Sequence, residues 1–414
     1  MFINLPEEVE SALDILQNSG FDAYVVGGCV RDSIIGIEPK DWDITTSALP
    51  DEIIKCFKDY KIIETGIKHG TVTVLINKIP LEVTTYRIDG KYKDNRRPEA
   101  VEFTNDISLD LMRRDFTINA LAYNSDGLVD IYGGVEDINL KQIKCVGDPD
   151  ARFNEDGLRI LRALRIASVL NFQIEKDTSA GIHKNKDLLN NISEERITCE
   201  FNKLVCGSNF FQIMADYKDV FEVFIHEIRN INYENWIKIL KSMTYVSKDL
   251  ILRLTLIFQN IEDREVILKN LKYDNYAITN VKILCGNLYE EIIPEPSHIK
   301  RFLNKIGYEN FKKLLIVKKA IIKSSSVNLY EINRLSEIEE IGRKIVEENQ
   351  CYRLKDLKIN GQDLIEAGFK KGKLVGYVLN DMLHKVIEGE LSNDRENLTD
   401  YIKKYKKLLD KDLF

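Results

Sequence analysis

The sequence is poor in proline, contains no cysteine pairs, and has no long hydrophobic run. With 8 prolines and 22 glycines in 414 residues, a collagen-like or low-complexity chain is excluded. The seven cysteines are scattered without any two-residue spacing, so we expect reduced thiols and a cytoplasmic protein rather than a disulfide framework or a zinc site. No apolar run approaches the ~18 residues of a membrane span, so no membrane association is expected.

Basic charge is also in short supply. The chain has 59 basic and 66 acidic residues, a net charge of −7, which excludes a uniformly basic nucleic-acid-binding surface. Any RNA contact must therefore use local patches. The segment 300–323 is one candidate, because eight basic residues stand there against a single acid, Glu309. A solvated helix face is the alternative interpretation.

The periodicity of the hydrophobic residues changes near residue 150. Before it, short runs of period-two alternation predict strands at 24–26, 71–76 and 81–86, with residues 77–80 as a hairpin connection. After it, helical periodicity dominates. We therefore expect an α+β head with a mixed β-sheet followed by all-α modules, in an elongated multi-domain chain. The expected domains are 1–145, 146–205, 206–325 and 326–414, and the expected later helices are 156–170, 194–205, 233–258, 299–323, 335–347, 361–368 and 374–389.

A glycine pair follows the first predicted strand. Gly27 and Gly28 let backbone N–H groups approach phosphate oxygens without obstruction by a side chain. Arg31, three residues further on, can pair with the same phosphates. A simple turn is the alternative, because most glycine pairs after strands are only turns.

An Asp-x-Asp pair comes about ten residues later. On a strand, Asp41 and Asp43 would project to the same face, where two carboxylates repel each other unless a cation lies between them. Magnesium, which favours carboxylates together with substrate phosphates, suits such a site. Two surface aspartates are the alternative. Glu82 would complete a triad if its strand neighbours that of Asp43, and Asp115 is a second candidate for the third carboxylate.

The succession of these motifs resembles the tRNA nucleotidyltransferases, the CCA-adding enzymes of the bacterial and eukaryotic class, within the polymerase-β-like superfamily. The resemblance is carried by the glycine pair, Asp41-x-Asp43 and the following motifs: His69-Gly70-Thr71-Val72, Glu82 to Arg87, Arg113 to Ala120, Glu155-Asp156-Gly157-Leu158-Arg159 and Ile192 to Ile197. It is specific over residues 24–205. Beyond them it depends on residues 361–364 and 371–376.

The resemblance implies an enzyme that adds and repairs the 3′-terminal CCA of tRNA without a nucleic-acid template. The substrates would be CTP and ATP, pyrophosphate would leave, and Mg²⁺ would be bound by Asp41 and Asp43, with Glu82 as a further catalytic carboxylate. Nucleotide-binding residues would be Gly28, Arg31, Arg114, Asp156, Arg159, Arg162 and Arg165. The acceptor arm of tRNA would lie on the basic segment 300–323 and the turn Lys370–Lys373.

Asp156 and Arg159 stand at i and i+3 of one predicted helix. A carboxylate and a guanidinium can pair with the edges of cytosine and adenine, whereas uracil and guanine present the reverse polarity. Arg162 and Arg165 continue at three-residue steps and would meet the triphosphate or the RNA end. An exposed salt bridge between Asp156 and Arg159 is the alternative.

Other activities remain as alternatives within and outside this family. The unbroken polar segment Tyr86–Pro98 resembles the complete flexible loop of the family, which disfavours an enzyme adding only CC but leaves A-only addition open. Some relatives carry an additional phosphohydrolase domain with a His-Asp metal site. The five histidines of this chain are dispersed and include no His-Asp pair, so no such activity is expected. From different classes, a noncatalytic RNA-binding protein on the same fold and a small-molecule nucleotidyltransferase are the rivals.

Overall fold

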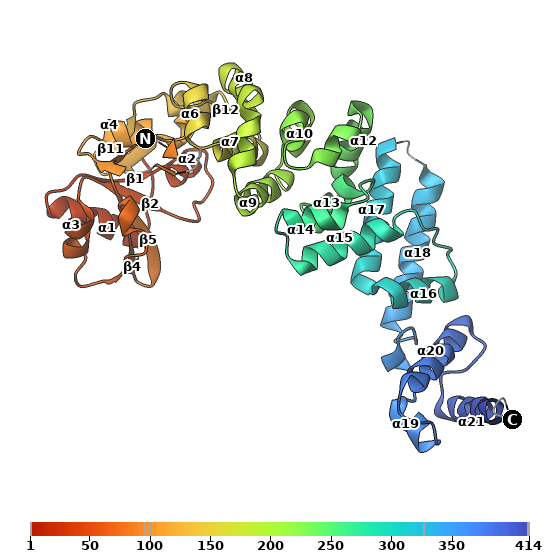
Figure 1. Ribbon diagram of the computed structural model, residues 1–414. Helices are drawn as coiled ribbons and strands as arrows, with labels where there is room; N and C mark the ends of the chain where they lie inside the picture. Colours follow the sequence, from red (N-terminus) through yellow and green to blue (C-terminus); the bar gives the residue numbers. More distant parts are fainter. Residues whose placement is uncertain (1, 91, 94–96, 99–100, 326–327, 412–414) are drawn as a thin grey trace. The chain divides into compact units, whose positions relative to one another are not determined.

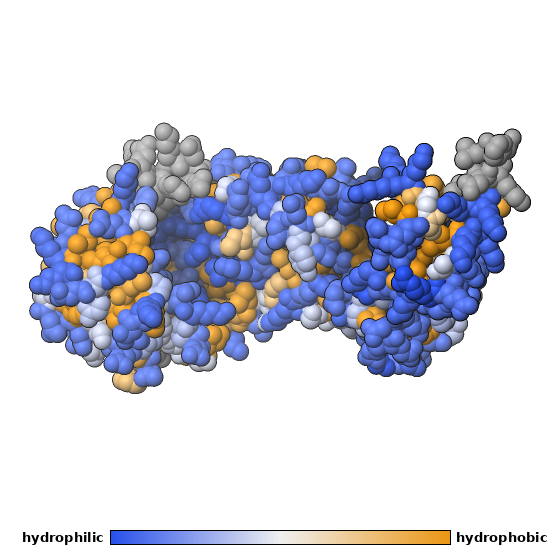
Figure 2. Space-filling view, turned by 90° about the horizontal axis from the view of Figure 1, so that it is seen from below, coloured by the Kyte–Doolittle hydropathy of each residue, from blue (hydrophilic) through white to orange (hydrophobic). Residues whose placement is uncertain are grey.

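The computed structural model describes residues 2–90, 92–93, 97–98, 101–325 and 328–411 (Figure 1). Its contacts divide the chain into two compact units, one of residues 1–232 with 270–272 and one of residues 233–269 with 273–414. The finer division into four domains stays a prediction. In the part of the chain that the structure describes, no helix is long and apolar enough to cross a membrane. Hydrophilic residues cover most of the face in Figure 2, with hydrophobic residues in separate patches.

The first unit contains a seven-stranded mixed sheet, as expected for the head. Its strand order is β11-β10-β1-β2-β5-β4-β3, and β2 pairs parallel with β5 while the other neighbours are antiparallel. The strands are β1 Ala23–Val26, β2 Asp43–Thr46, β3 Lys61–Ile63, β4 Thr71–Ile76, β5 Ile79–Thr85, β10 Leu121–Asn124 and β11 Gly127–Asp130. Helices of this part are α1 Glu7–Asn18, α2 Gly28–Ile34, α3 Pro50–Cys56, α4 Ile107–Met112 and α5 Gly134–Asn139.

The connection between β4 and β5 is shorter than predicted. Asn77 and Lys78 both have positive φ, 49° and 72°, and form a two-residue turn, so that Ile76 pairs with Ile79. Such a turn matches the twist of an antiparallel hairpin, and asparagine tolerates the left-handed region. Pro80 therefore lies inside β5, at a position that pairs with β4 but precedes the segment paired with β2.

The rest of the first unit is mainly helical. It comprises α6 Pro149–Glu155, α7 Leu158–Leu170, α8 Lys176–Asn185, α9 Glu194–Val205, α10 Phe210–Asp216 and α11 Lys218–Phe221. Helix α9 has the predicted bounds. Helix α7 begins two residues later than predicted, because Asp156 is extended (φ −139°, ψ 106°) and its carboxylate accepts a hydrogen bond from Leu158 N at 3.0 Å. Asp156 therefore precedes the helix and Arg159 lies in its first turn.

The second unit is helical, which confirms the expected all-α remainder. Its helices are α12 Tyr233–Met243, α13 Leu250–Phe258, α14 Arg264–Asn270 (whose last residue belongs to the first unit), α15 Asn275–Asn287, α16 Pro296–Ile306, α17 Tyr308–Ser325, α18 Leu329–Glu347, α19 Gly361–Glu366, α20 Lys373–Glu388 and α21 Arg395–Lys411. Two predicted helices were wrong in length, because each is a pair. The 233–258 helix is interrupted before Asp249, which caps α13. The 299–323 helix is interrupted at Gly307, where φ is +77°.

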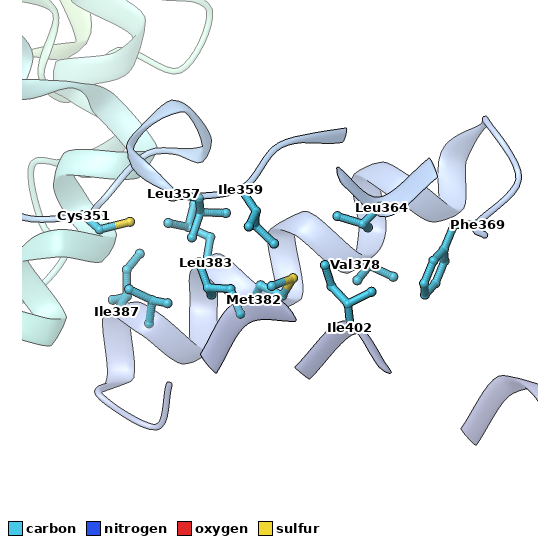
Figure 3. Close-up of a cluster of buried hydrophobic side chains, with 12 residues drawn as sticks. Cys351, Leu357, Ile359, Leu364, Phe369, Val378, Met382, Leu383, Ile387 and Ile402 are labelled. Atoms are coloured by element: carbon cyan, nitrogen blue, oxygen red, sulfur yellow. The ribbon is translucent and has the colours of Figure 1, made fainter. Parts of the chain in front are cut away.

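A separate hydrophobic core holds the C-terminal helices together (Figure 3). Side chains from α19, α20 and α21 meet there with those of the preceding loop. Leu364 and Val378 are fully buried in it, and Ile402 is nearly so. The members are Cys351, Leu357, Ile359, Leu364, Phe369, Val378, Met382, Leu383, Val386, Ile387, Leu398 and Ile402. This core makes a local test of packing straightforward.

We expect Leu364→Ala to destabilise the C-terminal helices by about 2–5 kcal/mol, because truncating a fully buried leucine leaves a cavity. Hydrogen exchange of the α20 and α21 amides measures this directly. Leu374→Ala is the matched control, since Leu374 is 39% exposed and its loss should leave exchange nearly unchanged. Equal exchange in both variants would contradict the assignment of Leu364 to this core.

Candidate active site

Two carboxylates lie side by side where β2 and β5 run parallel. Asp43 is the first residue of β2, and Glu82 is its register partner in β5. Paired residues of adjacent strands project to the same face of a sheet, so both carboxylates lie on one face, and both residues are exposed to solvent. The adjacency on which the Glu82 prediction depended is therefore present. Asp41 lies before the strand, so the expectation that both aspartates occupy a strand was wrong.

These acids affect one another electrostatically. Desolvation raises the pKa of Asp43, the Arg114 guanidinium opposes this rise, and the Glu82 and Asp41 carboxylates add to it. The site therefore has an excess of negative charge that a cation would relieve. Among the described residues, no group of three acidic, histidine or cysteine side chains could hold a metal ion alone. A few carboxylates completed by substrate phosphates are what Mg²⁺ commonly uses, so the donor set fits that ion.

The glycine pair gives Arg114 its place near these acids. Gly27 has φ +85° and ψ −130° and precedes α2, which begins at Gly28. A Cβ atom on Gly27 would stand 3.1 Å from Arg114 Nη1, so a side chain there would press against the guanidinium. Arg31, in α2, donates to Asp32 Oδ1 at 2.7 Å and to Asn119 Oδ1 at 2.6 Å. Arg31 is thus already bound to protein acceptors.

A buried carboxylate that the sequence analysis missed lies behind Arg114. The Asp110 side chain is fully buried and pairs with Arg113 at 2.7 Å and with Arg114 at 3.3 Å. Desolvation opposes ionisation, but Arg114 and Arg113 together hold the pKa of Asp110 below its usual value. The i,i+3 and i,i+4 spacing of Asp110 from two adjacent arginines was the signal in the sequence that could have identified it.

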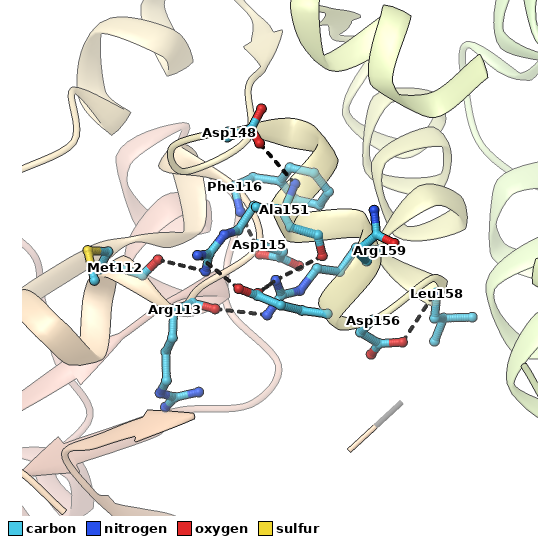
Figure 4. Close-up of polar contacts among 12 residues, drawn as sticks. Met112, Arg113, Asp115, Phe116, Asp148, Ala151, Asp156, Leu158 and Arg159 are labelled. Carbon is cyan, nitrogen blue, oxygen red and sulfur yellow. Dashed lines mark hydrogen bonds and ion pairs between the residues drawn. The ribbon is translucent and has the colours of Figure 1, made fainter. Parts of the chain in front are cut away.

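Asp156 and Arg159 do not pair with each other. Asp156 binds Arg196 of α9 at 2.8 Å. Arg159 is buried, and its guanidinium donates to the Arg113 carbonyl at 2.9 Å, to the Arg152 carbonyl at 3.1 Å and to the Glu155 carboxylate (Figure 4). The alternative of an exposed salt bridge between them is therefore wrong. Both side chains instead have partners in other parts of this unit.

Arg162 and Arg165 also have acidic partners. Arg162 Nε donates to Asp115 Oδ2 at 2.8 Å, and Arg165 Nε donates to Glu200 Oε2 at 2.8 Å. Asp115 further accepts a hydrogen bond from the Asn119 amide at 3.0 Å. Asp115, the second candidate for the third carboxylate, is thus engaged by these groups, whereas Glu82 is the acid in register with Asp43.

The expected RNA-contact segments differ from each other in their surroundings. Several basic residues of 300–323 bind acids from outside that segment, for example Lys313 with Asp249 at 3.0 Å and Lys319 with Glu339 at 2.6 Å. The sequence analysis counted only the acid inside the segment. Lys370, Lys371 and Lys373 are exposed, and they form no ion pair with the other residues that the structure describes. The predicted flexible loop Tyr86–Pro98 lies partly outside the described residues.

The Asp115–Arg162 pair predicts a pH effect on stability. Desolvation opposes ionisation of Asp115, but Arg162, Asn119 and Arg159 hold its pKa well below the usual value. A carboxyl with a depressed folded-state pKa stabilises the fold above its unfolded pKa of ~3.9 and loses this effect as the pH falls further. We expect Asp115→Asn to cost about 1.5–3 kcal/mol at pH 7 and to flatten the stability profile below pH ~4.

Urea denaturation of both proteins from pH ~7 to ~2 measures this difference. Asp177→Asn is the control, because Asp177 is an exposed aspartate of the same unit and forms no ion pair with the other residues that the structure describes. An unchanged slope below pH ~4 in Asp115→Asn would show that this carboxylate does not ionise as described.

Models of known protein families match most of the chain. The Poly A polymerase head domain matches residues 23–144, the probable RNA and SrmB-binding site of polymerase A matches residues 171–225, and the putative tRNA nucleotidyltransferase domain 2 matches residues 245–402. The three matches follow one another along the chain and span both compact units.

Full-length relatives and solved structures agree with these matches. The CCA-adding enzyme of Ligilactobacillus salivarius is 34% identical and covers 97% of this chain and 98% of its own, and that of Limosilactobacillus fermentum is 36% identical with 95% and 96% covered. The Bacillus stearothermophilus CCA-adding enzyme in complex with CTP is 27% identical, with a TM-score of 0.78 over 98% of each chain. The Thermotoga maritima enzyme complexed with tRNA_CCA, 20% identical with a TM-score of 0.67 over 97% of this chain and 96% of its own, shares the fold. On these relatives, the chain belongs to the class II CCA-adding tRNA nucleotidyltransferases, whose head is the poly(A) polymerase head domain.

Proposed function

We propose that this protein adds C, C and A in turn to the 3′ end of tRNA, using CTP and ATP and releasing pyrophosphate. The observation that carries the proposal is the register of Asp43 with Glu82, with the Arg114 guanidinium lowering the pKa of Asp43 against the effect of burial. Acids gathered beside one cation suit a reaction in which a triphosphate must be held next to negatively charged side chains. The relatives named above support the choice of tRNA as acceptor. The free cysteines support a cytoplasmic location.

The three carboxylates of the site would have two different roles in the reaction. Asp41 and Asp43 would hold Mg²⁺, and Glu82 would attract the proton of the terminal 3′-hydroxyl as its oxygen attacks the α-phosphate. When bound, the metal supplies Lewis-acid stabilisation of the charge that develops on the phosphate oxygens. The bond from the α-phosphorus to the bridging oxygen breaks, and pyrophosphate carries away the negative charge.

Nucleotide binding falls to the glycine turn and the arginines around it. Gly28 would present backbone N–H groups to the phosphates, and Arg31 and Arg114 would add positive charge. Arg114 is the better placed of the two. Arg31 already donates to Asp32 and Asn119, whereas the ion pair of Arg114 within the described part of the chain is with Asp110.

Base selection would be performed by Asp156 and Arg159, with Arg162 and Arg165 toward the triphosphate or the RNA end. Each of these side chains has protein partners in the absence of nucleotide. Accepting a base therefore requires an exchange of partners, in which the hydrogen bonds of the nucleotide replace those of Arg196 and the backbone carbonyls. Buried polar groups left unpaired by a wrong base would disfavour it by ~1–3 kcal/mol each.

The direct test is the incorporation of labelled CTP and ATP, with Mg²⁺, into tRNA transcripts ending at the discriminator base, at C, or at CC. We expect two C and one A on the shortest transcript, and a loss of activity of at least ~10³-fold in the double variant Asp41→Ala with Asp43→Ala. Asp51→Ala with Asp59→Ala, two other acids of the head, is the control.

Two results would contradict the proposal. Extension of the CC-ended transcript alone would make the protein an A-adding enzyme. Binding of tRNA without incorporation into any transcript would leave a noncatalytic RNA-binding protein on this fold.

A second prediction concerns the choice of base. Asp156→Asn should raise incorporation of UTP relative to CTP by about tenfold or more, because an amide offers a donor to the reversed edge of uracil where a carboxylate offers only acceptors. Competition between labelled UTP and CTP measures the ratio. Asp177→Asn, an exposed aspartate in the same unit, should leave it unchanged. An unaltered ratio in Asp156→Asn would remove Asp156 from base selection.

A further inference from the structure

Asp110 is a fully buried carboxylate to which the proposed mechanism gives no part. It lies in the short helix α4, and its side chain has no exposed surface. Burying a charge is costly unless it is paired and hydrogen-bonded, so a carboxylate in this position needs several partners. Asp110 has them, and they come from three separate elements of the head.

Its Oδ1 atom binds one side of this arrangement. Arg113 donates to it through Nε at 3.0 Å and Nη2 at 2.7 Å, and the backbone N–H of Arg87 donates at 3.3 Å. Arg87 is the first residue of β6, Arg87–Asp89, which pairs with β9, Val101–Phe103. Asp110 therefore fixes the point at which the chain leaves β5 and enters the β6–β9 ribbon.

Its Oδ2 atom lies toward β2 and Arg114. Arg114 Nη2 lies 3.3 Å from it, and the Thr45 hydroxyl lies 3.3 Å from it as well. Thr45 stands two residues after Asp43 in β2 and is paired with Thr84, two residues after Glu82. One carboxylate group thus joins Arg114 to the strand that carries the reacting acids.

Besides its attraction to Asp43, Arg114 has few directional contacts with the residues that the structure describes. Its Nε atom is buried and has no hydrogen-bond partner among the described residues, and its Nη1 atom lies against Gly27, which offers no side chain. Among the described residues, the ion pair with Asp110 is therefore the hydrogen-bonded contact that sets the position of the guanidinium. A guanidinium that is held in advance binds a phosphate or ribose oxygen without a further cost of ordering.

We propose that Asp110 is a positioning residue, which locks Arg114 and the start of the β6–β9 ribbon to the catalytic strand β2, so that the nucleotide-binding cation keeps a fixed place relative to Asp43. The inference rests on the proposed function, because it assigns Arg114 to the incoming nucleotide. Asp110 itself touches neither substrate nor metal in this scheme. The substitution of Asp110 should therefore affect the binding of CTP and ATP equally, because Arg114 would bind a part that the two nucleotides have in common.

The test is a double-mutant cycle on nucleotide kinetics with full-length protein and tRNA transcripts. Asp110→Asn should raise KM for CTP and for ATP about tenfold, with a smaller change in kcat and an unchanged KM for tRNA. Arg114→Gln should raise the same KM values at least as much. The double variant should match Arg114→Gln alone, because once the guanidinium is gone Asp110 has nothing left to position.

Asp106→Asn is the matched control, because it makes the same chemical change at the exposed N-cap of the same helix. It should leave all kinetic constants unchanged. Should Asp110→Asn fail to fold, as judged by thermal melting, Asp110→Glu keeps the buried charge while displacing it, and the cycle is measured with that variant.

Two outcomes would overturn the inference. If the effects of the Asp110 and Arg114 substitutions multiply, Asp110 acts independently of Arg114 and supports the fold only. If Asp110 substitution raises KM for tRNA as much as KM for the nucleotides, its effect is a general loss of structure. An inactive wild-type protein would instead refute the proposed function, so the two failures are distinguishable.

Discussion

The parallel pairing of β2 with β5 is the constraint on which the candidate site depends. Side chains alternate between the faces of a sheet, so a shift of one residue in this register would move Glu82 to the opposite face from Asp43. The neighbours of these acids prevent such a shift, because Ile44 and Val83, the next pair along the two strands, are fully buried. The hydrophobic core under the sheet thereby fixes the distance between two solvent-exposed carboxylates.

The charges around that pair are arranged in layers of increasing burial. Asp43 and Glu82 face solvent, the Arg114 guanidinium acts on Asp43, and the fully buried Asp110 pairs with Arg114. Each charge is stabilised by the next one. The guanidinium reduces the repulsion between the exposed acids, and the buried acid neutralises the guanidinium. Gly27 contributes by having no side chain where Arg114 must pass. The ion pair with Asp110 therefore keeps the Arg114 guanidinium close to the exposed acids instead of letting the side chain turn out into solvent.

Local patterns in the sequence were enough to predict strands β1, β4 and β5 and helix α9, because period-two alternation and helical periodicity are properties of short segments. These patterns gave wrong element boundaries where the backbone conformation of a single residue ended or delayed an element. The left-handed Asn77 and Lys78 shortened a loop, Gly307 divided a helix, and Asp156 delayed the start of another. The partners of Asp110, Arg162 and Arg165 were beyond reach, since Arg87, Asp115 and Glu200 are brought to them only by the tertiary fold.

The internal pairing of the arginines in α7 bears on how a protein can replace a nucleic-acid template. Removing the acidic partner of Arg162 or of Arg165 costs about 1.5–3 kcal/mol, because a hydrogen bond to a charged group is lost. These arginines therefore do not leave their acidic partners unless another anion takes their place. A triphosphate brings its own negative charge, however, and can take the place of a carboxylate such as Asp115 or Glu200 without leaving the guanidinium unpaired. A base likewise brings donors and acceptors that can replace Arg196 and the backbone carbonyls. On the proposed function, the protein partners would hold these side chains in order between additions. A nucleotide that matches both the charge and the hydrogen-bond polarity of those partners would then displace them at little cost.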